Sequence, residues 1–507
     1  MTPSTTINRK VYGMQTISVP TPQLVKFTTA DETDLALDVY FPDETDRTPR
    51  PVVLLMTPYQ KPNLMPTELP IADLTANGYL CVVADIRGTG ESSGIFEGPL
   101  SPREIQDGAE LIEWLADQDF SNGQVALAGG SYCGAIQMLV AAKRPRGLVC
   151  IAPSVGPIDF YRDWTHRGGI PSHTNWAAGT FLQANQPNCS IAPALEFYYK
   201  VAQATPLDGE VFWERSAYRV LSSIEVPALF MGGLFDYFGR GTLRAFDNLK
   251  APKRLVLGPW GHQYPEDSSE LLNWLAYWLK GEGENPTERD NVKFWMIGAE
   301  DWHSSKGRRL PGSHLAVPLG AEIPTIPVTE TFRGWPMSAP PSPVPVFMDT
   351  GTNSGMHLWG ETVTRDLDIP EGTEIQGAPI LKLDVASPEC RDIDLHARLS
   401  LVHPNGEVTQ LTEARLRLSH RTIDEHASRY LANGEIEYVH HKHTQEQPLS
   451  LESTNEVLLQ FQPTGVALQP GYRLRLGFSA CRADGVLRPS EIYLAGQSAL
   501  LLPTLNL

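Results

Sequence analysis

The sequence predicts an α/β sheet with a helical cap inserted into it, followed by a C-terminal β-sandwich or jelly roll. Three observations predict this arrangement. Strand and helix patterns alternate in the first third of the chain, an aromatic-rich segment interrupts them, and short alternating segments follow after about residue 291. The expected units are residues 1–153 and 224–290 for the two parts of the α/β core, 154–223 for the cap and 291–507 for the β domain.

The α/β core is predicted from apolar residues that recur with two different periods. Short continuous apolar runs are typical of central parallel strands, and apolar residues at helical spacing predict the helices between them. The expected strands are 52–56, 79–84, 125–128, 148–152, 226–231 and 254–257, with 35–41 as a half-buried edge strand, and the expected helices are 105–116, 135–143 and 267–280.

The cap and the β domain differ from the core in composition. The cap is rich in aromatic residues, Pro, Gly and Asn, and such insertions lie over the carboxyl ends of the strands, where α/β sheets bind ligands. Turn signals such as His403-Pro-Asn-Gly406 separate the strands of the β domain. These strands are expected at 292–296, 380–385, 393–402, 414–418, 457–461 and 472–478, and the Pro-rich stretch 334–345 is expected to be an extended connection.

Composition and charge exclude several classes of partner. The net charge of −18 argues against nucleic acid or an anionic membrane, because both would repel the protein. The six cysteines are scattered without metal-ligand spacing, and no metal or organic cofactor is expected. The N-terminal segment lacks the apolar stretch of a signal peptide and no run is long enough to span a bilayer, so a cytoplasmic location is expected.

The segment from Val125 to Gly134 carries the clearest functional signal. An apolar strand runs directly into Gly129-Gly130-Ser131 and then into a helix, and this context holds a serine hydroxyl above the sheet as a nucleophile. The small residues around the serine allow the turn to close. A glycine-rich loop with a structural serine is the alternative interpretation.

A serine nucleophile needs a base, and the base needs a carboxylate that orients it. Asp236 and His262 each follow one of the last two predicted strands of the core, in the chain order serine, acid, histidine. We therefore expect both side chains at the same edge of the sheet as Ser131.

Other histidines among the 13 in the chain are weaker candidates. His440, His441 and His443 lie in a polar stretch without a nearby cysteine, and we expect them to be surface residues rather than metal ligands. His166 and His173 fall in the predicted cap and are candidates for the substrate pocket.

Negative charge develops on the carbonyl oxygen in the transition state and needs two preorganised donors. The backbone N–H of Tyr132, directly after the nucleophile, is the first. The loop after strand 52–56 is expected to supply the second, but it reads Thr57-Pro58-Tyr59-Gln60-Lys61 and lacks a run of glycines. The Tyr59 hydroxyl is a candidate, although a buried structural tyrosine is equally common.

Taken together, these motifs resemble the CocE/NonD family of serine hydrolases, the group of the cocaine esterases and X-Pro dipeptidyl-peptidases. The resemblance covers nearly the whole chain, and several motifs carry it: Pro58-Tyr59-x-Lys61, Asp85-x-Arg87-Gly88-x-Gly90-x-Ser92-x-Gly94, Gly129-x-Ser131-Tyr132-x-Gly134, Trp213-Glu214-Arg215-Ser216, Gly258-Pro259-Trp260-x-His262 and Trp278-Leu279-Lys280-Gly281.

The resemblance implies an α/β-hydrolase core with Ser131 as nucleophile, His262 as general base and then acid, and Asp236 as its orienting partner. It also assigns the oxyanion hole to the Tyr59 hydroxyl and the Tyr132 N–H. The loop that contains Arg87 is expected to be structural, tying loops together beneath the site.

Departures from the family pattern bear on the substrate. Related cocaine esterases tend to have Trp-Tyr-Asp where this chain has Leu234-Phe235-Asp236. The α-amino-acid ester hydrolases place acidic residues just after that aspartate to hold an ammonium group, whereas Tyr237-Phe238-Gly239 follow here, which makes a free α-amine less suitable. The candidate pocket walls are therefore aromatic, with core packing as the alternative for each: Phe235, Tyr237, Phe238, Phe160, Tyr161 and Trp164.

The leading hypothesis is a serine hydrolase that cleaves an uncharged, rather apolar carboxylic ester through an acyl-enzyme, without a cofactor. The same groups would serve an amidase or X-Pro-type peptidase, or an acyltransferase or cyclase that excludes water. A catalytically inactive binding module on the same scaffold is a further alternative. For the enzymatic hypotheses the expected partner is a small ester or amide.

Overall fold

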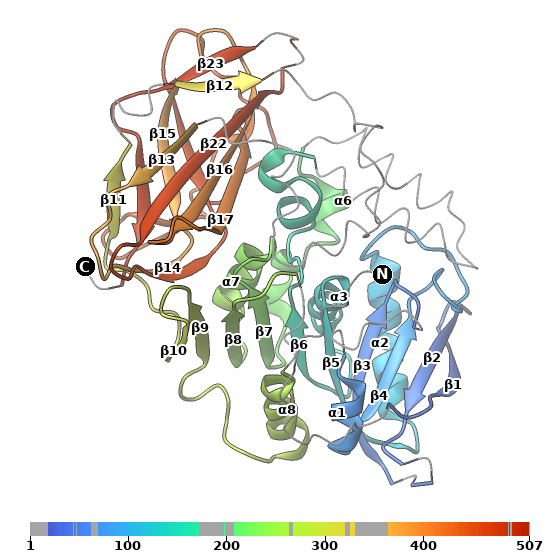
Figure 1. The fold of residues 1–507 in the computed structure, drawn as a ribbon. Coiled ribbons are helices and arrows are strands. Elements are labelled where there is room, and N and C mark those ends of the chain that lie inside the picture. The colour runs from blue at the N-terminus through green and yellow to red at the C-terminus, as the bar shows by residue number, and fades with distance from the viewer. Residues whose placement is uncertain are drawn as a thin grey trace, which may run out of the picture.

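Two sheets of ten strands each organise the residues that the structure describes. The computed structural model describes residues 19–43, 45–46, 48–61, 69–171, 197, 207–262, 267–319, 325–329, 363–484, 486 and 489–505. The α/β core lies at the lower right of Figure 1 and the β-rich domain at the upper left.

The first sheet is mixed, with strand order β1-β2-β4-β3-β5-β6-β7-β8-β9-β10. From β4 to β9 in this order, each strand runs parallel to the next one. The pairs β1–β2, β2–β4 and β9–β10 are antiparallel. The strands are β1 (Gln23–Thr28), β2 (Asp34–Tyr40), β3 (Arg50–Thr57), β4 (Leu80–Asp85), β5 (Ser121–Gly130), β6 (Leu148–Ser154), β7 (Ala228–Gly233), β8 (Lys253–Gly258), β9 (Val292–Met296) and β10 (Asp301–Ser305).

Two predictions about this sheet were wrong. The strand expected at the edge, 35–41, is β2, and β1 covers it on its outer side. The strand expected to open the β domain, 292–296, is β9, which pairs with β8 and extends the first sheet instead. The hairpin of β9 and β10 therefore belongs to the α/β sheet, although it follows residue 291.

Helices cover both faces of the first sheet. Residues of β3 alternate between two cores: Val52 and Leu54 face the helices α2, α3 and α7, and Val53 and Leu55 face α1 and α8. This alternation follows from the two-residue period of a strand that is buried on both faces. The helices are α1 (Ile71–Ala76), α2 (Pro102–Ala116), α3 (Tyr132–Ala141), α7 (Gly239–Asn248) and α8 (Ser269–Leu275), and α8 continues into the π-helical turn η6 (Ala276–Lys280).

The second sheet forms the β domain, with strand order β11-β24-β15-β23-β12-β22-β16-β17, while β13 pairs with β22 and β20 with β15. Two further pairs, β14–β21 and β18–β19, flank it. The elements are β11 (His314–Pro318), β12 (Thr325–Thr329), β13 (Val363–Leu367), β14 (Glu374–Gly377), β15 (Ile380–Ala386), β16 (Ile393–Val402), β17 (Val408–Arg417), η8 (Leu418–His420), β18 (Arg429–Tyr430), β19 (Ile436–Tyr438), β20 (Asn455–Gln460), β21 (Thr464–Ala467), β22 (Arg473–Arg482), β23 (Ser490–Leu494) and β24 (Ala499–Pro503).

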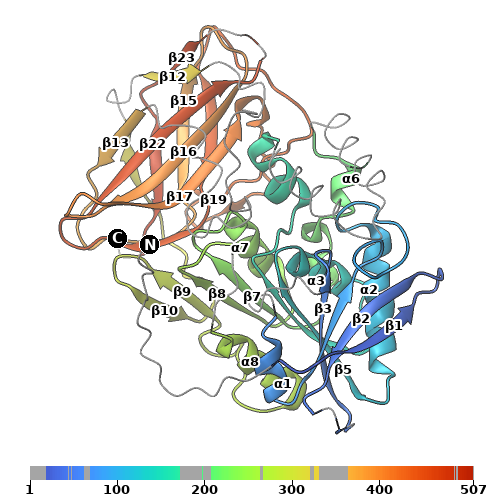
Figure 2. The ribbon, with the colours of Figure 1, turned by 45° about the vertical axis from the view of Figure 1, so that its right-hand side comes forward.

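The described part of the predicted cap consists of short helical turns between the two sheets, visible beside α7 in Figure 2. These turns are η2 (Phe160–Thr165), η3 (Arg167–Gly169), α6 (Glu210–Trp213), η4 (Ala217–Arg219) and η5 (Leu221–Ser223). The predicted pocket residue His173 and the Pro-rich stretch 334–345 lie outside the described residues. No helix in the described ranges is long and apolar enough to cross a membrane.

Candidate active site

Ser131 occupies the sharp turn between β5 and α3. Its backbone lies at φ 57° and ψ −122°, a conformation that costs a non-glycine residue about 1–3 kcal/mol and is concentrated at functional sites. Gly129 precedes it at φ 140°, and a Cβ there would lie 2.8 Å from the Cβ of Cys133. The predicted strand–turn–helix geometry is therefore present, and it raises the serine above the end of its strand.

Three side chains from three loops meet at this edge of the sheet. His262 follows β8, and its Nε2 lies 2.8 Å from Ser131 Oγ. Its Nδ1 lies 3.0 Å from Oδ1 of Asp236, which follows β7. The Asp236 side chain is fully buried, whereas 24% of the His262 side chain is exposed, so the imidazole faces the open side of the site.

Backbone hydrogen bonds tie the loops of the acid and the base together. The Leu234 N–H donates to the Gly258 carbonyl at 2.9 Å, and the Phe235 N–H donates to the Trp260 carbonyl at 3.1 Å. Adjacent parallel strands thus continue their pairing beyond the sheet, and the distance between carboxylate and imidazole is set by the backbone.

Tyr132 directly follows the serine, and Tyr59 contacts Tyr132. The Tyr132 N–H belongs to the first turn of α3, where backbone N–H groups have no partner within the helix and can bind an oxyanion. Tyr59 follows β3, and its ring meets the Tyr132 ring edge-on at a centroid distance of 6.2 Å. The two expected oxyanion donors therefore come from neighbouring residues in space.

Glu104 is a residue of this site that the sequence reasoning missed. The Tyr132 hydroxyl donates to Glu104 Oε2 at 2.7 Å and accepts from the Leu100 N–H at 3.0 Å. Burial raises the pKa of Glu104 to about 8. The pattern Ser101-x-x-Glu104 signals the start of α2, where Ser101 accepts from the Glu104 N–H, but it does not signal the contact with Tyr132. The glutamate side chain anchors Tyr132 instead of completing the capping box.

Lys61 and Asp85 join two of the family motifs. The Lys61 N–H donates to Asp85 Oδ1 at 2.8 Å, and its Nζ lies 3.1 Å from Oδ2 of the same carboxylate. Both side chains are buried, and Lys61 Nζ also bonds Glu91 at 2.8 Å. This anchor fixes the loop that carries Tyr59, two residues earlier.

Arg87 ties loops together, as expected. Its guanidinium forms a bidentate contact with Asp107 of α2, both bonds at 2.5 Å, and reaches Asp31 at 3.3 Å. The Arg87 side chain is buried beneath these loops and holds them together.

Three of the residues predicted to line the substrate pocket lie around the His262 ring or its loop. Tyr237 stacks on the His262 ring at a centroid distance of 4.9 Å, and Phe238 meets it edge-on at 5.3 Å. Phe235 is half-buried and packs against the core of the first sheet. The His262 ring therefore contacts two aromatic rings.

The remaining wall candidates lie in η2 and just after it. Trp164 meets the Tyr132 ring edge-on at 5.9 Å and Phe160 at 5.1 Å. Phe160 itself is buried. His166 is also buried, stacks on Tyr161 at 4.6 Å and has its Nδ1 3.0 Å from Thr165 Oγ1. Trp164 is thus the member of this group that lies beside Tyr132, one of the expected oxyanion donors.

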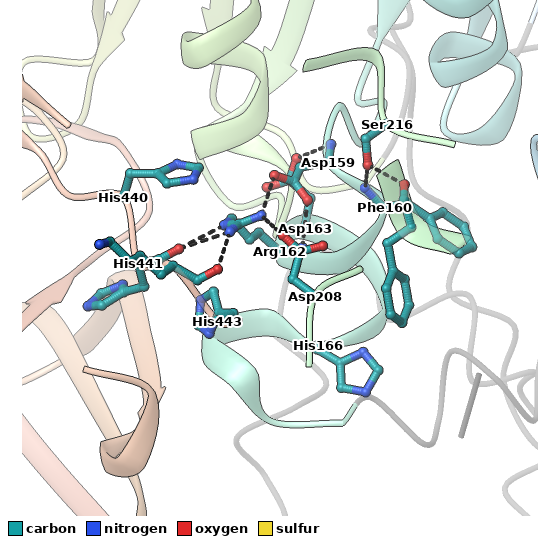
Figure 3. A network of polar contacts seen from close by, with 12 residues as sticks. Asp159, Phe160, Arg162, Asp163, His166, Asp208, Ser216, His440, His441 and His443 are labelled. Carbon is teal, nitrogen blue, oxygen red and sulfur yellow. Dashed lines mark hydrogen bonds and ion pairs between the residues drawn. The ribbon is translucent and has the colours of Figure 1, made fainter. Parts of the chain in front are cut away.

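The prediction that His440, His441 and His443 are surface residues was wrong, because all three are buried. Figure 3 shows them around Arg162. Their segment packs against the cap turn η2. Arg162 of this turn donates to the His441 carbonyl at 2.9 Å and to the Lys442 carbonyl at 2.8 Å. The structure groups no three His, Cys, Asp or Glu side chains for a metal within the described residues.

Comparison with known proteins identifies the family. The model of the X-Pro dipeptidyl-peptidase (S15 family) matches residues 31–264, and that of the X-Pro dipeptidyl-peptidase C-terminal non-catalytic domain matches 362–496. The chain belongs to the CocE/NonD family of serine hydrolases. This hydrolase is 24% identical over 475 residues to the cocaine esterase of Rhodococcus sp. (strain MB1 Bresler), with 77% of this chain and 82% of that protein covered.

Solved structures share the fold over almost the whole chain. A CocE/NonD family hydrolase from Staphylococcus aureus gives a TM-score of 0.77 at 20% identity, covering 95% of this chain and 93% of that one. An α-amino acid ester hydrolase gives 0.73 at 16% identity, covering 99% and 100%. This CocE/NonD hydrolase therefore pairs an α/β-hydrolase core with a β-rich C-terminal domain, and its activity is that of an esterase or peptidase.

Proposed function

We propose that this hydrolase cleaves an apolar carboxylic ester through an acyl-enzyme intermediate. The observation that carries the proposal is the hydrogen-bonded line from Ser131 Oγ through both nitrogens of His262 to Asp236 Oδ1. Such a line lets an imidazole take the serine proton while a carboxylate stabilises the imidazolium that forms.

In this mechanism Ser131 Oγ attacks the ester carbonyl as its proton moves to His262 Nε2. The tetrahedral intermediate collapses, and His262 returns the proton to the departing alcohol. A water molecule then enters, gives a proton to His262 and attacks the acyl-serine carbonyl. The second tetrahedral intermediate collapses, the bond to Ser131 Oγ breaks, and His262 returns the proton to that oxygen. This releases the carboxylic acid and restores Ser131.

The oxyanion of each tetrahedral intermediate would accept hydrogen bonds from the Tyr132 N–H and the Tyr59 hydroxyl. The contact between the two tyrosine rings supports this assignment, because it keeps the Tyr59 loop next to the start of α3. A preorganised donor of this kind contributes about 100- to 1,000-fold to turnover.

An uncharged or apolar group next to the ester suits the surroundings of the base. Tyr237 and Phe238 flank His262, and the Arg167 guanidinium lies 4.9 Å from the centroid of the Tyr237 ring. A cation at this position would repel a free α-ammonium group, which disfavours aminoacyl esters and X-Pro peptides.

The test is hydrolysis of a p-nitrophenyl acyl ester series by the wild type and by Ser131→Ala, with mass spectrometry for an acyl adduct. We expect serine-dependent turnover, slower cleavage of acyl groups that carry a free α-ammonium group, and an adduct on Ser131. Equal rates in both proteins would reject the mechanism. Faster serine-dependent cleavage of Gly-Pro p-nitroanilide would favour a peptidase, and acyl transfer to added alcohols in preference to water would favour a transferase.

A further inference from the structure

A cavity lined by four arginines lies where the core, the cap turns and the β domain meet. It contains about 300 Å³ of unfilled space, including its open mouth. Figures 1 and 2 both place α7 directly below β17 in this region. The lining residues that matter for its chemistry are Arg162, Arg167, Arg240, Glu413, Arg415 and Gln462.

A glycine brings the cap turn η3 onto β17 and so builds this cavity. Gly168 lies at φ 64°, and a Cβ there would lie 2.1 Å from the Arg415 carbonyl oxygen. Only glycine permits this approach of the two backbones. It places the neighbouring Arg167 beside the side chains of β17, with its guanidinium 3.9 Å from Glu413.

The arginines outnumber the carboxylates that face them. Asp159 and Asp208 pair with Arg162 at 3.1 and 2.7 Å and balance its charge. Glu413 is shared between Arg415, at 2.8 Å, and Arg167. This leaves Arg240, which makes no ion pair with any other residue that the structure describes.

Three arginines, Arg167, Arg240 and Arg415, therefore line the cavity with one ion-paired carboxylate, Glu413, in a chain whose net charge is −18. The Nε atoms of Arg167 and Arg240 are buried without a hydrogen-bond partner among the described residues. Burial, and to a lesser degree Arg415, lower the pKa of Arg167 to about 10, so the group stays charged at neutral pH. Buried cations and unused donors of this kind are stabilised by an anion.

Two other carboxylates lie near the cavity but are used elsewhere. Asp163 accepts the backbone N–H groups of Ile158 and Asp159, each at 3.0 Å. Asp236 is bonded to His262 and acts on Arg167 only through space, as Asp163 does on Arg240. Neither forms an ion pair with Arg240 or Arg167 within the described chain.

We propose that this cavity is a binding site for an anionic group, a carboxylate or a phosphate, held by Arg167, Arg240 and Arg415. Planar guanidinium groups bind both anions through paired hydrogen bonds. The site lies close to the reaction centre, because Arg167 covers one face of Tyr237 and His262 stacks on the same ring. The anion is either a free ion or the distal end of a substrate whose ester reaches Ser131.

The binding test uses the full chain with inorganic phosphate or glutarate at constant ionic strength, measured by thermal shift and isothermal titration. We expect saturable stabilisation by at least one of the two anions, and an affinity about tenfold or more lower in Arg240→Gln and Arg415→Gln, as for loss of a hydrogen bond between charged groups. Glu413→Gln removes the carboxylate that competes with the anion for the arginines, so this variant should bind the anion more tightly than the wild type. Misfolding could not produce such a gain. The exposed Arg146→Gln is the control and should bind like the wild type.

Absence of saturable binding of both anions, or equal affinities in the wild type and Arg240→Gln, would overturn the proposal. Anion binding is measured without turnover, so saturable phosphate binding by the wild type would support the anion site even if the wild type hydrolysed no ester. That outcome would reject the proposed esterase activity alone.

Two p-nitrophenyl esters separate the two sources of the anion, the neutral hexanoate and the adipate monoester that carries a terminal carboxylate. If the substrate supplies the anion, the adipate ester should have a KM about tenfold lower than the hexanoate, and this ratio should fall towards one in Arg240→Gln. Phosphate should then compete with the adipate ester only. If a free ion is the ligand, phosphate should change kcat/KM for both esters alike.

Discussion

The loop that carries His262 and the segment that carries His440, His441 and His443 place the same side chain in two opposite settings. His262 is partly exposed, has a carboxylate on one nitrogen and faces a serine hydroxyl with the other. The other three are buried, and burial together with nearby arginines such as Arg162 lowers their pKa values. An imidazole can act as a base only where its protonated form is stabilised and the reactants can reach it.

The buried segment has a different function, which is to join the two parts of the protein. Its backbone carbonyls accept hydrogen bonds from Arg162 of the cap turn η2, and Asp159 and Asp208 balance that guanidinium (Figure 3). The contrast predicts that substitutions in the first region change turnover and that substitutions in the second change stability.

The largest expected difference is between His262→Asn and His441→Asn. Loss of the base should lower kcat by about 10⁵- to 10⁶-fold with little change in Tm. Loss of the His441 imidazole, whose Nε2 lies 2.9 Å from the Leu458 carbonyl, should cost about 1–3 kcal/mol of unfolding free energy and leave kcat within a few-fold of the wild type. Steady-state kinetics and thermal unfolding of both variants measure the two effects. Similar activity losses in the two variants would contradict the distinction.

The two buried carboxylates Asp236 and Asp159 extend the comparison. Asp236→Asn should reduce kcat by about 10⁴-fold, because the amide no longer stabilises the imidazolium or selects the correct tautomer. Asp159→Asn leaves Arg162 and Arg244 with less negative charge and should destabilise the fold by about 3–5 kcal/mol. Kinetics should show the larger loss of kcat in Asp236→Asn, and urea unfolding should show the larger loss of stability in Asp159→Asn. A stability loss in Asp236→Asn as large as that in Asp159→Asn would argue against a catalytic function of Asp236.

A smaller effect is expected from the oxyanion hydroxyl. Tyr59→Phe should lower kcat by about 100- to 1,000-fold with KM nearly unchanged, because the hydrogen bond strengthens only in the transition state. Tyr79→Phe is the matched control: its buried hydroxyl has no hydrogen-bond partner among the described residues, so its removal should leave kcat unchanged. A wild-type kcat in Tyr59→Phe would remove Tyr59 from the oxyanion hole.

The family, the fold class and the meeting of Ser131, Asp236 and His262 could be predicted because their signals are local or follow chain order. Each of the three residues comes directly after a strand with a clear apolar pattern, and parallel strands end at one edge of the sheet. The strand 393–402 coincides with β16 for the same reason, since its alternation is regular over ten residues.

The errors concern contacts between segments far apart in the chain. His440 and His441 stand in a polar stretch and become buried because residues far apart in the chain pack against them, among them Arg162, 279 positions before His441. The pattern of 292–296 predicts a strand but not its neighbour, which is β8 of the first sheet. Glu104 reaches Tyr132 across 28 positions, and the capping pattern around it gives no sign of that partner. Local patterns report an element and its exposed face, but not the element against which it packs.

The smallest expected effect is a pH dependence of stability that the buried histidines contribute. Burial lowers the pKa of His441 to about 3 in the folded state, while the unfolded value is about 6.5. Between these values the unfolded chain binds a proton that the folded protein excludes. Stability is therefore complete above about pH 6.5 and decreases as the pH falls towards 3, by about 1.4 kcal/mol per pH unit for this residue.

Urea unfolding at pH 6.5, 5.5 and 4.5 measures how the free energy of unfolding changes with pH. Carboxylates also contribute to this change, so the test compares the wild type with variants. His441→Asn should start less stable at pH 6.5 and then lose about 1.4 kcal/mol less per pH unit than the wild type, so that the two curves converge in acid. The exposed His426→Asn should run parallel to the wild type. Parallel curves for all three proteins would mean that protonation of His441 is not coupled to unfolding. The contrast between His262 as a base and the buried histidines as structural residues would then rest on the activity measurements alone.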